Sequence, residues 1–212
     1  MKKITKITTL IVLSVLTVTA CAQKPTTNYY ISISHEVSDY DSWKNIFDKF
    51  NNDRMEAGIV DLFVKKNINN TNSVTVFSKV KDLNKAKAFM ASATLQEAMK
   101  KAGVISAPVI VYYKSALEYE KIHSSSLVTT ITHSVADFTA WKETYESAQE
   151  VRKNAEISDH LVLRSLSNEN VITVLGTATS AAKFNEFMSN PDLKEIMEKA
   201  GVTSKPEVEV LL

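Results

Sequence analysis

The chain has 212 residues, of which 44% are hydrophobic and 23% are charged, with four glycines and four prolines. This composition is typical of a globular protein and excludes collagen-like and low-complexity disordered chains. The formal net charge is +1, and a near-neutral chain lacks the basic surface that nucleic-acid binding usually needs, so we expect no nucleic-acid partner. The single cysteine excludes an intrachain disulfide and an all-cysteine zinc site.

Residues 1–20 are predicted to form a signal peptide. Lysines lie among the first six residues, and an apolar, hydroxyl-rich stretch follows from Ile7 to Val18. This stretch is shorter than the roughly 20 residues that a membrane-spanning helix needs. It ends in small residues before Cys21. An ordinary secretory peptide with an incidental cysteine is the alternative.

The run Val18-Thr19-Ala20-Cys21 resembles the lipobox of bacterial lipoproteins. The resemblance implies that Cys21 carries a diacylglycerol and an acyl chain such as palmitate, which together anchor the protein to a membrane of the cell envelope. An Asp after the cysteine favours the inner membrane in enterobacteria, so Ala22 favours the periplasmic side of the outer membrane in a Gram-negative host. We expect residues 21–28, which are polar, to form a tether.

The remainder of the chain consists of two tandem copies of one unit. A shift of 98 residues aligns the two copies without a gap, and roughly a third of the aligned positions are identical. His35 aligns with His133, and the run Lys101-Ala102-Gly103-Val104 aligns with the run that begins at Lys199. We define repeat 1 as residues 29–114 and repeat 2 as residues 127–212, with residues 115–126 as a serine-containing linker.

Each repeat is predicted to contain strand, helix, strand, strand, helix and strand. Residues 30–35 alternate as a strand does, and Asp39 stands where a helix N-cap belongs. Aromatic residues then recur at helical spacing over residues 40–50. Two strands, 59–64 and 74–77, flank a turn-rich segment at 69–72. A second helix, interrupted near Ser92, precedes Gly103 and the last strand.

This order is that of the ferredoxin-like plait, in which two helices cover one face of a four-stranded sheet. The other face must be buried. We therefore predict an α+β fold in which two ferredoxin-like βαββαβ repeats pack as an intrachain, pseudo-symmetric α+β barrel. Because the pairing is satisfied within one chain, we expect a monomer.

The pattern His-x-Val-x-Asp-(Tyr/Phe)-x-x-Trp-Lys, starting at His35 and at His133, resembles a group of bacterial proteins in the dimeric α+β barrel superfamily. The ending Leu-x-x-x-Met-x-x-Ala-Gly-Val-x-x-x-Pro resembles the same group, and the likeness covers nearly everything after the tether. That superfamily includes the antibiotic biosynthesis monooxygenases. Its haem-degrading members place an iron-ligating His on the second helix, where this chain has none. We therefore expect no haem, no other cofactor and no metal.

His35 and His133, at the end of the first strand of each repeat, are the candidate catalytic residues, because histidine exchanges protons near neutral pH. The alternative is a structural role beside the helix start. Trp43 and Trp141 are candidate ligand-binding residues or core residues. Lys44, Lys142, Arg54 and Arg152 are either partners of an anionic ligand or part of a solvated helix surface.

Further candidate ligand-binding residues lie on the strands. The hydroxyl-bearing residues of the first strands share one face, which we expect to line the barrel: Ser32, Ser34, Thr130 and Thr132. Three polar residues of repeat 2 replace apolar ones of repeat 1: His160, Glu207 and Glu209. They predict either a proton-transfer or weak metal site or a solvated edge strand.

Two functions follow from these observations, and a purely structural or protein-docking role is a third alternative. The first is a membrane-anchored envelope lipoprotein whose barrel domain binds a small molecule. The second is a cofactor-free enzyme of the monooxygenase or isomerase type that uses a strand-end His as acid or base. The sequence leaves open whether the protein is an enzyme.

Overall fold

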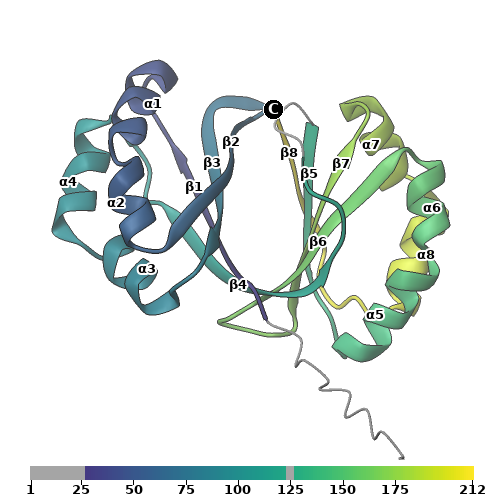
Figure 1. Ribbon diagram of the computed structural model, residues 1–212. Helices are drawn as coiled ribbons and strands as arrows, with labels where there is room; N and C mark the ends of the chain where they lie inside the picture. Colours follow the sequence, from purple (N-terminus) through teal and green to yellow (C-terminus); the bar gives the residue numbers. More distant parts are fainter. Residues whose placement is uncertain (1–26, 123–126) are drawn as a thin grey trace, which may run out of the picture.

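Each repeat folds into four strands and four helices in the computed structural model, which describes residues 27–122 and 127–212 (Figure 1). Repeat 1 contains β1 (Tyr29–Glu36), α1 (Tyr40–Lys49), α2 (Asn51–Glu56), β2 (Ile59–Asn67), β3 (Asn70–Val80), α3 (Leu83–Met90), α4 (Ala93–Lys101) and β4 (Val109–Glu118). Repeat 2 contains β5 (Leu127–Ser134), α5 (Phe138–Ser147), α6 (Gln149–Asn154), β6 (Ile157–Ser165), β7 (Val171–Ala178), α7 (Ala181–Met188), α8 (Pro191–Lys199) and β8 (Glu207–Leu211).

The predicted signal peptide and Cys21 lie outside the described residues. Within the described part of the chain, every helix is too short or too polar to cross a bilayer.

The predicted first helix of each repeat is two helices in the structure. In repeat 1 the break falls at Phe50, which ends α1 and precedes α2. The predicted break in the second helix is confirmed in both repeats. Ser92 caps α4 by accepting a hydrogen bond from the Leu95 N–H, and Asn190 caps α8 with Pro191 at its first position.

The helix ends have the predicted chemistry. The Asp39 carboxylate accepts a hydrogen bond of 2.8 Å from the Ser42 N–H, and Asp137 caps α5 in the same way. The chain leaves the last helical turn through Gly103 and Gly201, whose φ values of 79° and 76° lie in the left-handed region.

Two strand boundaries differ from the sequence prediction. Strands β2 and β3 are longer than expected, because only Ile68 and Asn69 form the turn between them. Strand β4 continues to Glu118, into the predicted linker, because its last residues pair with β6 of the other repeat.

The eight strands form one closed barrel in the order β1-β3-β2-β8-β5-β7-β6-β4. The two halves meet at two seams. Strand β4 pairs with β6 along Tyr113–Glu118, and β2 pairs with β8 at Asn67 opposite Leu211. The helices cover the barrel on its two outer sides (Figure 1). The predicted α+β fold, with two ferredoxin-like repeats in a pseudo-symmetric barrel, is confirmed.

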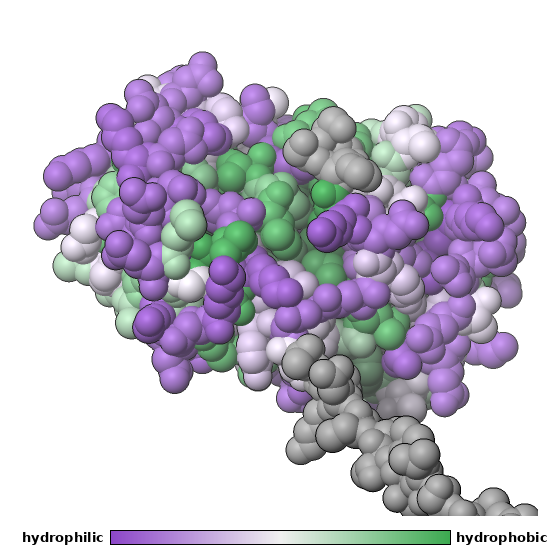
Figure 2. Space-filling view, viewed as in Figure 1, coloured by the Kyte–Doolittle hydropathy of each residue, from purple (hydrophilic) through white to green (hydrophobic). Residues whose placement is uncertain are grey.

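The barrel interior holds the sheet faces that the helices leave bare. Repeat 1 contributes mainly aromatic rings and repeat 2 contributes aliphatic side chains. Phe77 stacks on Tyr30 with ring centroids 5.5 Å apart and on Phe63 at 5.3 Å. Figure 2 shows hydrophilic residues over the outer helices and hydrophobic ones toward the strands between them. Most of the barrel interior is therefore an apolar core shared by the two repeats: Tyr30, Phe63, Phe77, Tyr113, Val128, Leu161, Leu163, Leu175 and Leu211.

We expect Phe77→Ala to lower the free energy of unfolding by about 3–5 kcal/mol, because it removes a buried ring that contacts two others. Ile105→Ala is the control, since Ile105 is 64% exposed and its truncation should change stability by no more than about 0.5 kcal/mol. Urea unfolding measures both. Equal effects would contradict a core inside the barrel.

Candidate functional site

Each repeat has an apolar pocket between its helices and the outer face of its half of the barrel. Each pocket encloses a cavity of about 60 Å³. The repeat 1 pocket is lined by Ile33, His35, Trp43, Ile46, Phe47, Phe50, Arg54, Ile59, Val76, Ser78, Phe89, Met90, Leu95, Ala98, Met99 and Ala102. The repeat 2 pocket is lined by Ile131, His133, Trp141, Tyr145, Ala148, Val151, Arg152, Val174, Phe187, Leu193, Ile196, Met197 and Ala200.

The two candidate catalytic histidines lie in these pockets. Side chains alternate along β1, so His35 faces the helices together with Ile31 and Ile33. His35 is 6% exposed and His133 is 4% exposed. Neither ring nitrogen of either histidine has a hydrogen-bond partner among the described residues. Buried polar atoms without a hydrogen-bond partner are uncommon, because each one lowers the stability of the folded state by about 1–3 kcal/mol.

Burial keeps both imidazoles neutral near pH 7. It lowers the pKa of His35 and lowers that of His133 from its ordinary value to about 4. A neutral imidazole offers one N–H donor and one acceptor nitrogen. Each imidazole thus presents one donor and one acceptor inside a lining that is otherwise apolar apart from Arg54 and Ser78 in repeat 1 and Tyr145 and Arg152 in repeat 2.

The tryptophans lie beside the histidines in both repeats. Ring centroids are 5.4 Å apart for His35 and Trp43, and 5.6 Å apart for His133 and Trp141. Trp43 in turn stacks on Phe47 at 4.9 Å, and Trp141 stacks on Tyr145 at the same distance. The indoles therefore act as core residues and as pocket walls at the same time.

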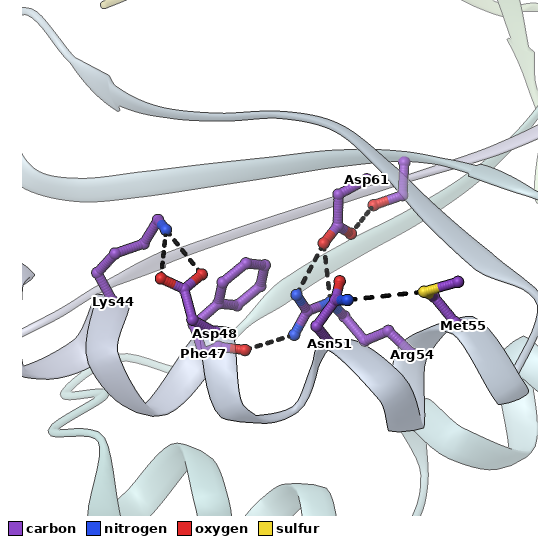
Figure 3. Close-up of polar contacts among 8 residues, drawn as sticks. Lys44, Phe47, Asp48, Asn51, Arg54, Met55 and Asp61 are labelled. Atoms are coloured by element: carbon purple, nitrogen blue, oxygen red, sulfur yellow. Dashed lines mark hydrogen bonds and ion pairs between the residues drawn. The ribbon is translucent and has the colours of Figure 1, made fainter.

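An arginine closes each stack at its far end. The Arg54 guanidinium lies 3.6 Å from the Phe47 ring centroid, and its Nη1 donates a 2.6 Å hydrogen bond to the Phe47 carbonyl. Its Nε donates to the Asp61 carboxylate at 2.9 Å, and the Ser78 hydroxyl donates to the same carboxylate (Figure 3). Arg54 was expected either to bind an anionic ligand or to lie on a solvated helix surface, and neither expectation fits. It is a buried cation that pairs with Asp61.

Repeat 2 builds the same ion pair with a different second donor. Arg152 donates to both oxygens of Asp159, and the Tyr145 hydroxyl donates to Asp159 at 2.8 Å. Sequence reasoning missed both aspartates. Asp61 and Asp159 are each retained seven positions after the arginine, which is the signal that could have identified the pair.

Lys44 and Lys142, in contrast, lie on the helix surface. Each forms an ion pair with an acidic residue one turn later on the same helix, Asp48 or Glu146. Figure 3 shows Lys44 directed toward Asp48 and away from Arg54.

The hydroxyl-bearing residues of the first strands face the barrel interior. The hydroxyls of Ser34 and Thr75 are 3.0 Å apart, and those of Thr132 and Thr173 are 2.9 Å apart. Ser32, Thr130 and Thr132 line a cavity of about 40 Å³ together with Glu209. This volume suits a few water molecules. The helix–sheet pockets are therefore the better candidates for an organic ligand.

The residues that distinguish repeat 2 do not form one cluster. Both ring nitrogens of His160 are hydrogen-bonded, one to the Glu120 carbonyl and one to the Thr177 hydroxyl. Glu209 bonds weakly to Thr130 in the barrel, where burial raises its pKa, and Glu207 is exposed. Among the described residues, no group of three or more His, Cys, Asp or Glu is placed to hold a metal ion.

We expect stability to fall as the pH drops from about 6.5 toward 4. The pKa of His133 is about 4 in the folded chain and about 6.5 when unfolded, so the unfolded chain binds the proton more readily in that interval. The loss attributable to His133 is about 3 kcal/mol. Urea unfolding at a series of pH values should show His133→Leu flattening this dependence. An unchanged slope would mean that His133 does not titrate as a buried base.

Comparison with protein-family profiles gives no match, and comparison with the sequences of curated proteins gives none either. Solved structures do match. A candidate monooxygenase from Lactobacillus acidophilus has a TM-score of 0.60 at 12% identity, with 88% of this chain and 94% of that chain covered. An anthrone oxidase-like protein has a TM-score of 0.62 at 8% identity, with 88% and 91% covered.

A ferredoxin-fold protein from Listeria monocytogenes related to antibiotic biosynthesis monooxygenases has a TM-score of 0.50 at 10% identity, with 88% and 96% covered. At these identities the likeness extends to the fold alone. The structural neighbours of this chain are thus α+β barrels of the kind that the sequence pattern indicates.

Proposed function

We propose that each helix–sheet pocket binds a small, largely apolar molecule that carries one hydrogen-bonding group. The observation that supports this proposal is the pair of buried imidazoles, His35 and His133, whose nitrogens have no partner among the described residues. A ligand hydroxyl or carbonyl would satisfy one of these nitrogens, and its apolar body would contact the indole of Trp43 or Trp141.

Pocket size sets the scale of the ligand. Each cavity of about 60 Å³ is smaller than the roughly 150 Å³ apolar cavity that accepts benzene. A single-ring ligand therefore requires side chains to move. Met90 and Met99 line the repeat 1 pocket, and Met197 lines the repeat 2 pocket. Unbranched thioether side chains rearrange at low cost, so they supply this adaptability.

An acid–base enzyme is the second candidate, and the fold of the monooxygenase-like neighbours favours it. The low pKa of His133, about 4, works against it. Removing a proton from a phenol of pKa about 10 would be uphill by about 8 kcal/mol for so weak a base. Hydrogen bonding to a bound molecule requires no such proton transfer. Binding is therefore the function that the pockets support best.

We expect phenol to bind to the pockets and the double variant His35→Leu, His133→Leu to bind it about tenfold more weakly, because one hydrogen bond is worth about 1.4 kcal/mol. Calorimetric titration measures both affinities. His160→Leu is the matched control, since His160 is outside the pockets and repeat 1 already carries Leu62 at that position. Equal affinity in the double variant would rule out the histidines as ligand partners.

We further propose that Cys21 carries lipid and anchors the protein to a membrane of the cell envelope. The short apolar segment and the small residues before the only cysteine support this proposal. The outer membrane is the proposed site in a host with two membranes. Closure of the barrel within one chain supports a monomer on that surface.

Cys21→Ser should move the protein from the membrane fraction to the soluble fraction, because it removes the sulfur that accepts the diacylglycerol. Incorporation of labelled palmitate should disappear with it. Fractionation of cells that express either form gives the result, with Ser38→Ala as the unrelated control. A Cys21→Ser protein that stays on the membrane would exclude lipidation as the anchor.

A further inference from the structure

The two pockets are equal in volume but differ in the placement of large and small side chains. At the junction of the first two helices of each repeat, Phe50 of repeat 1 aligns with Ala148 of repeat 2. On the last helix the order is reversed, because Ala98 aligns with Ile196. All four residues line their pockets. The larger side chain therefore lies at the helix junction in repeat 1 and on the last helix in repeat 2.

A surface cavity lies beside α6 in repeat 2. It has a volume of about 320 Å³ and is bordered by α6, α7 and the start of α8. Val151 and Phe187 border both this outer cavity and the repeat 2 pocket. The residue of repeat 1 that aligns with Val151 is Asp53, an exposed charged residue. A thin layer of apolar side chains is thus what separates the repeat 2 pocket from a larger space.

The outer cavity has both polar and apolar lining residues, and its charges are paired. Its lining includes Asn154, Asn190, Lys183 and Glu186. The Lys183 ammonium lies 3.7 Å from Glu186 and 3.4 Å from Glu156, so its charge is already compensated. Such a lining suits an uncharged hydrogen-bonding group better than an anion or a cation.

We propose that the two sites take ligands of different length: the repeat 1 pocket takes a compact ring, and the repeat 2 pocket takes a longer molecule that passes between Val151 and Phe187 and places an uncharged polar end in the outer cavity. This inference rests on the proposed function, since both sites use the same histidine contact. Ala148 leaves the space through which the longer molecule runs, and Phe50 closes the corresponding space in repeat 1.

The chain carries one tryptophan in each pocket, so ligand binding can be measured separately at the two sites. The two indole N–H signals of the full chain are recorded by NMR and assigned with Trp43→Phe. The chain is titrated with phenol and, separately, with hydroxyphenylpropanol, a phenol that bears a three-carbon alcohol chain opposite the hydroxyl. We expect the Trp141 signal to report about tenfold tighter binding of the longer molecule than of phenol. The Trp43 signal should report less than about a twofold difference.

Ala148→Phe should abolish the preference at Trp141, measured as the ratio of the two affinities, and it should also weaken phenol binding there, because Ala148 lines the repeat 2 pocket. Phe50→Ala is the matched control, because it alters repeat 1 and should leave the Trp141 titration unchanged. Val151→Asp, at a partly exposed position, provides a second blocking variant if Ala148→Phe does not fold. Equal length dependence at the two indoles, or no effect of either blocking variant, would overturn the inference. No response of either indole to either molecule would instead refute the proposed function.

Discussion

The structure depends on the burial of two sheet faces that the helices cannot cover. Each four-stranded half has an apolar inner face, and the two halves enclose these faces by pairing their edge strands, β4 with β6 and β2 with β8. Neither half could leave Phe63, Phe77 or its counterparts in water without losing the dominant favourable contribution to folding. The two seams differ in length, because β4 pairs with β6 along Tyr113–Glu118 whereas β2 pairs with β8 only around Asn67. The second repeat is therefore a structural requirement of the first.

This arrangement assigns different tasks to the two faces of each sheet. Aromatic rings of repeat 1 pack in the barrel interior against aliphatic chains of repeat 2, beside a small cavity that is partly lined by hydroxyl groups. The outer faces carry the helices, and the first helical segment of each repeat is split at Phe50 or Ala148. The pockets form under these split helices. A rigid barrel with adaptable helices around it is a suitable scaffold for binding, because the histidine on the strand stays fixed while the methionines on the helices can move.

Sequence reasoning predicted the fold because the repeat supplied its own internal comparison. Periodicity, caps and the terminal glycines are local signals, and each is confirmed in both copies. The two barrel seams are non-local. Strand β4 extends past residue 114 because it forms hydrogen bonds with β6. The sequence of residues 115–118 alone does not indicate this distant pairing. The site was less predictable because its lining, too, depends on contacts between residues far apart in the sequence. Alternation along β1 places the serines inward, but it does not show how completely the phenylalanines of other strands fill the interior.

The differences between the repeats show which contacts the fold must keep and which it can exchange. The partly buried aspartate has a second donor besides arginine: in repeat 1 the donor is Ser78 on the strand, and in repeat 2 it is Tyr145 on the helix. The strand position is then Gly176, where a Cβ would lie 2.9 Å from the Ser158 carbonyl oxygen. The backbone of repeat 2 leaves no room for a side chain at this strand position, and Tyr145 supplies the second donor from the helix instead. The exchange of Phe50 and Ala98 for Ala148 and Ile196 follows the same rule of conserved volume. Unlike the aspartate exchange, however, it moves the larger side chain from the helix junction to the last helix. Val151, in place of Asp53, adds an apolar side chain to the pocket one turn after Ala148. The junction of repeat 2 is thus lined by smaller apolar side chains than that of repeat 1, and the proposed difference in ligand length depends on this difference in lining.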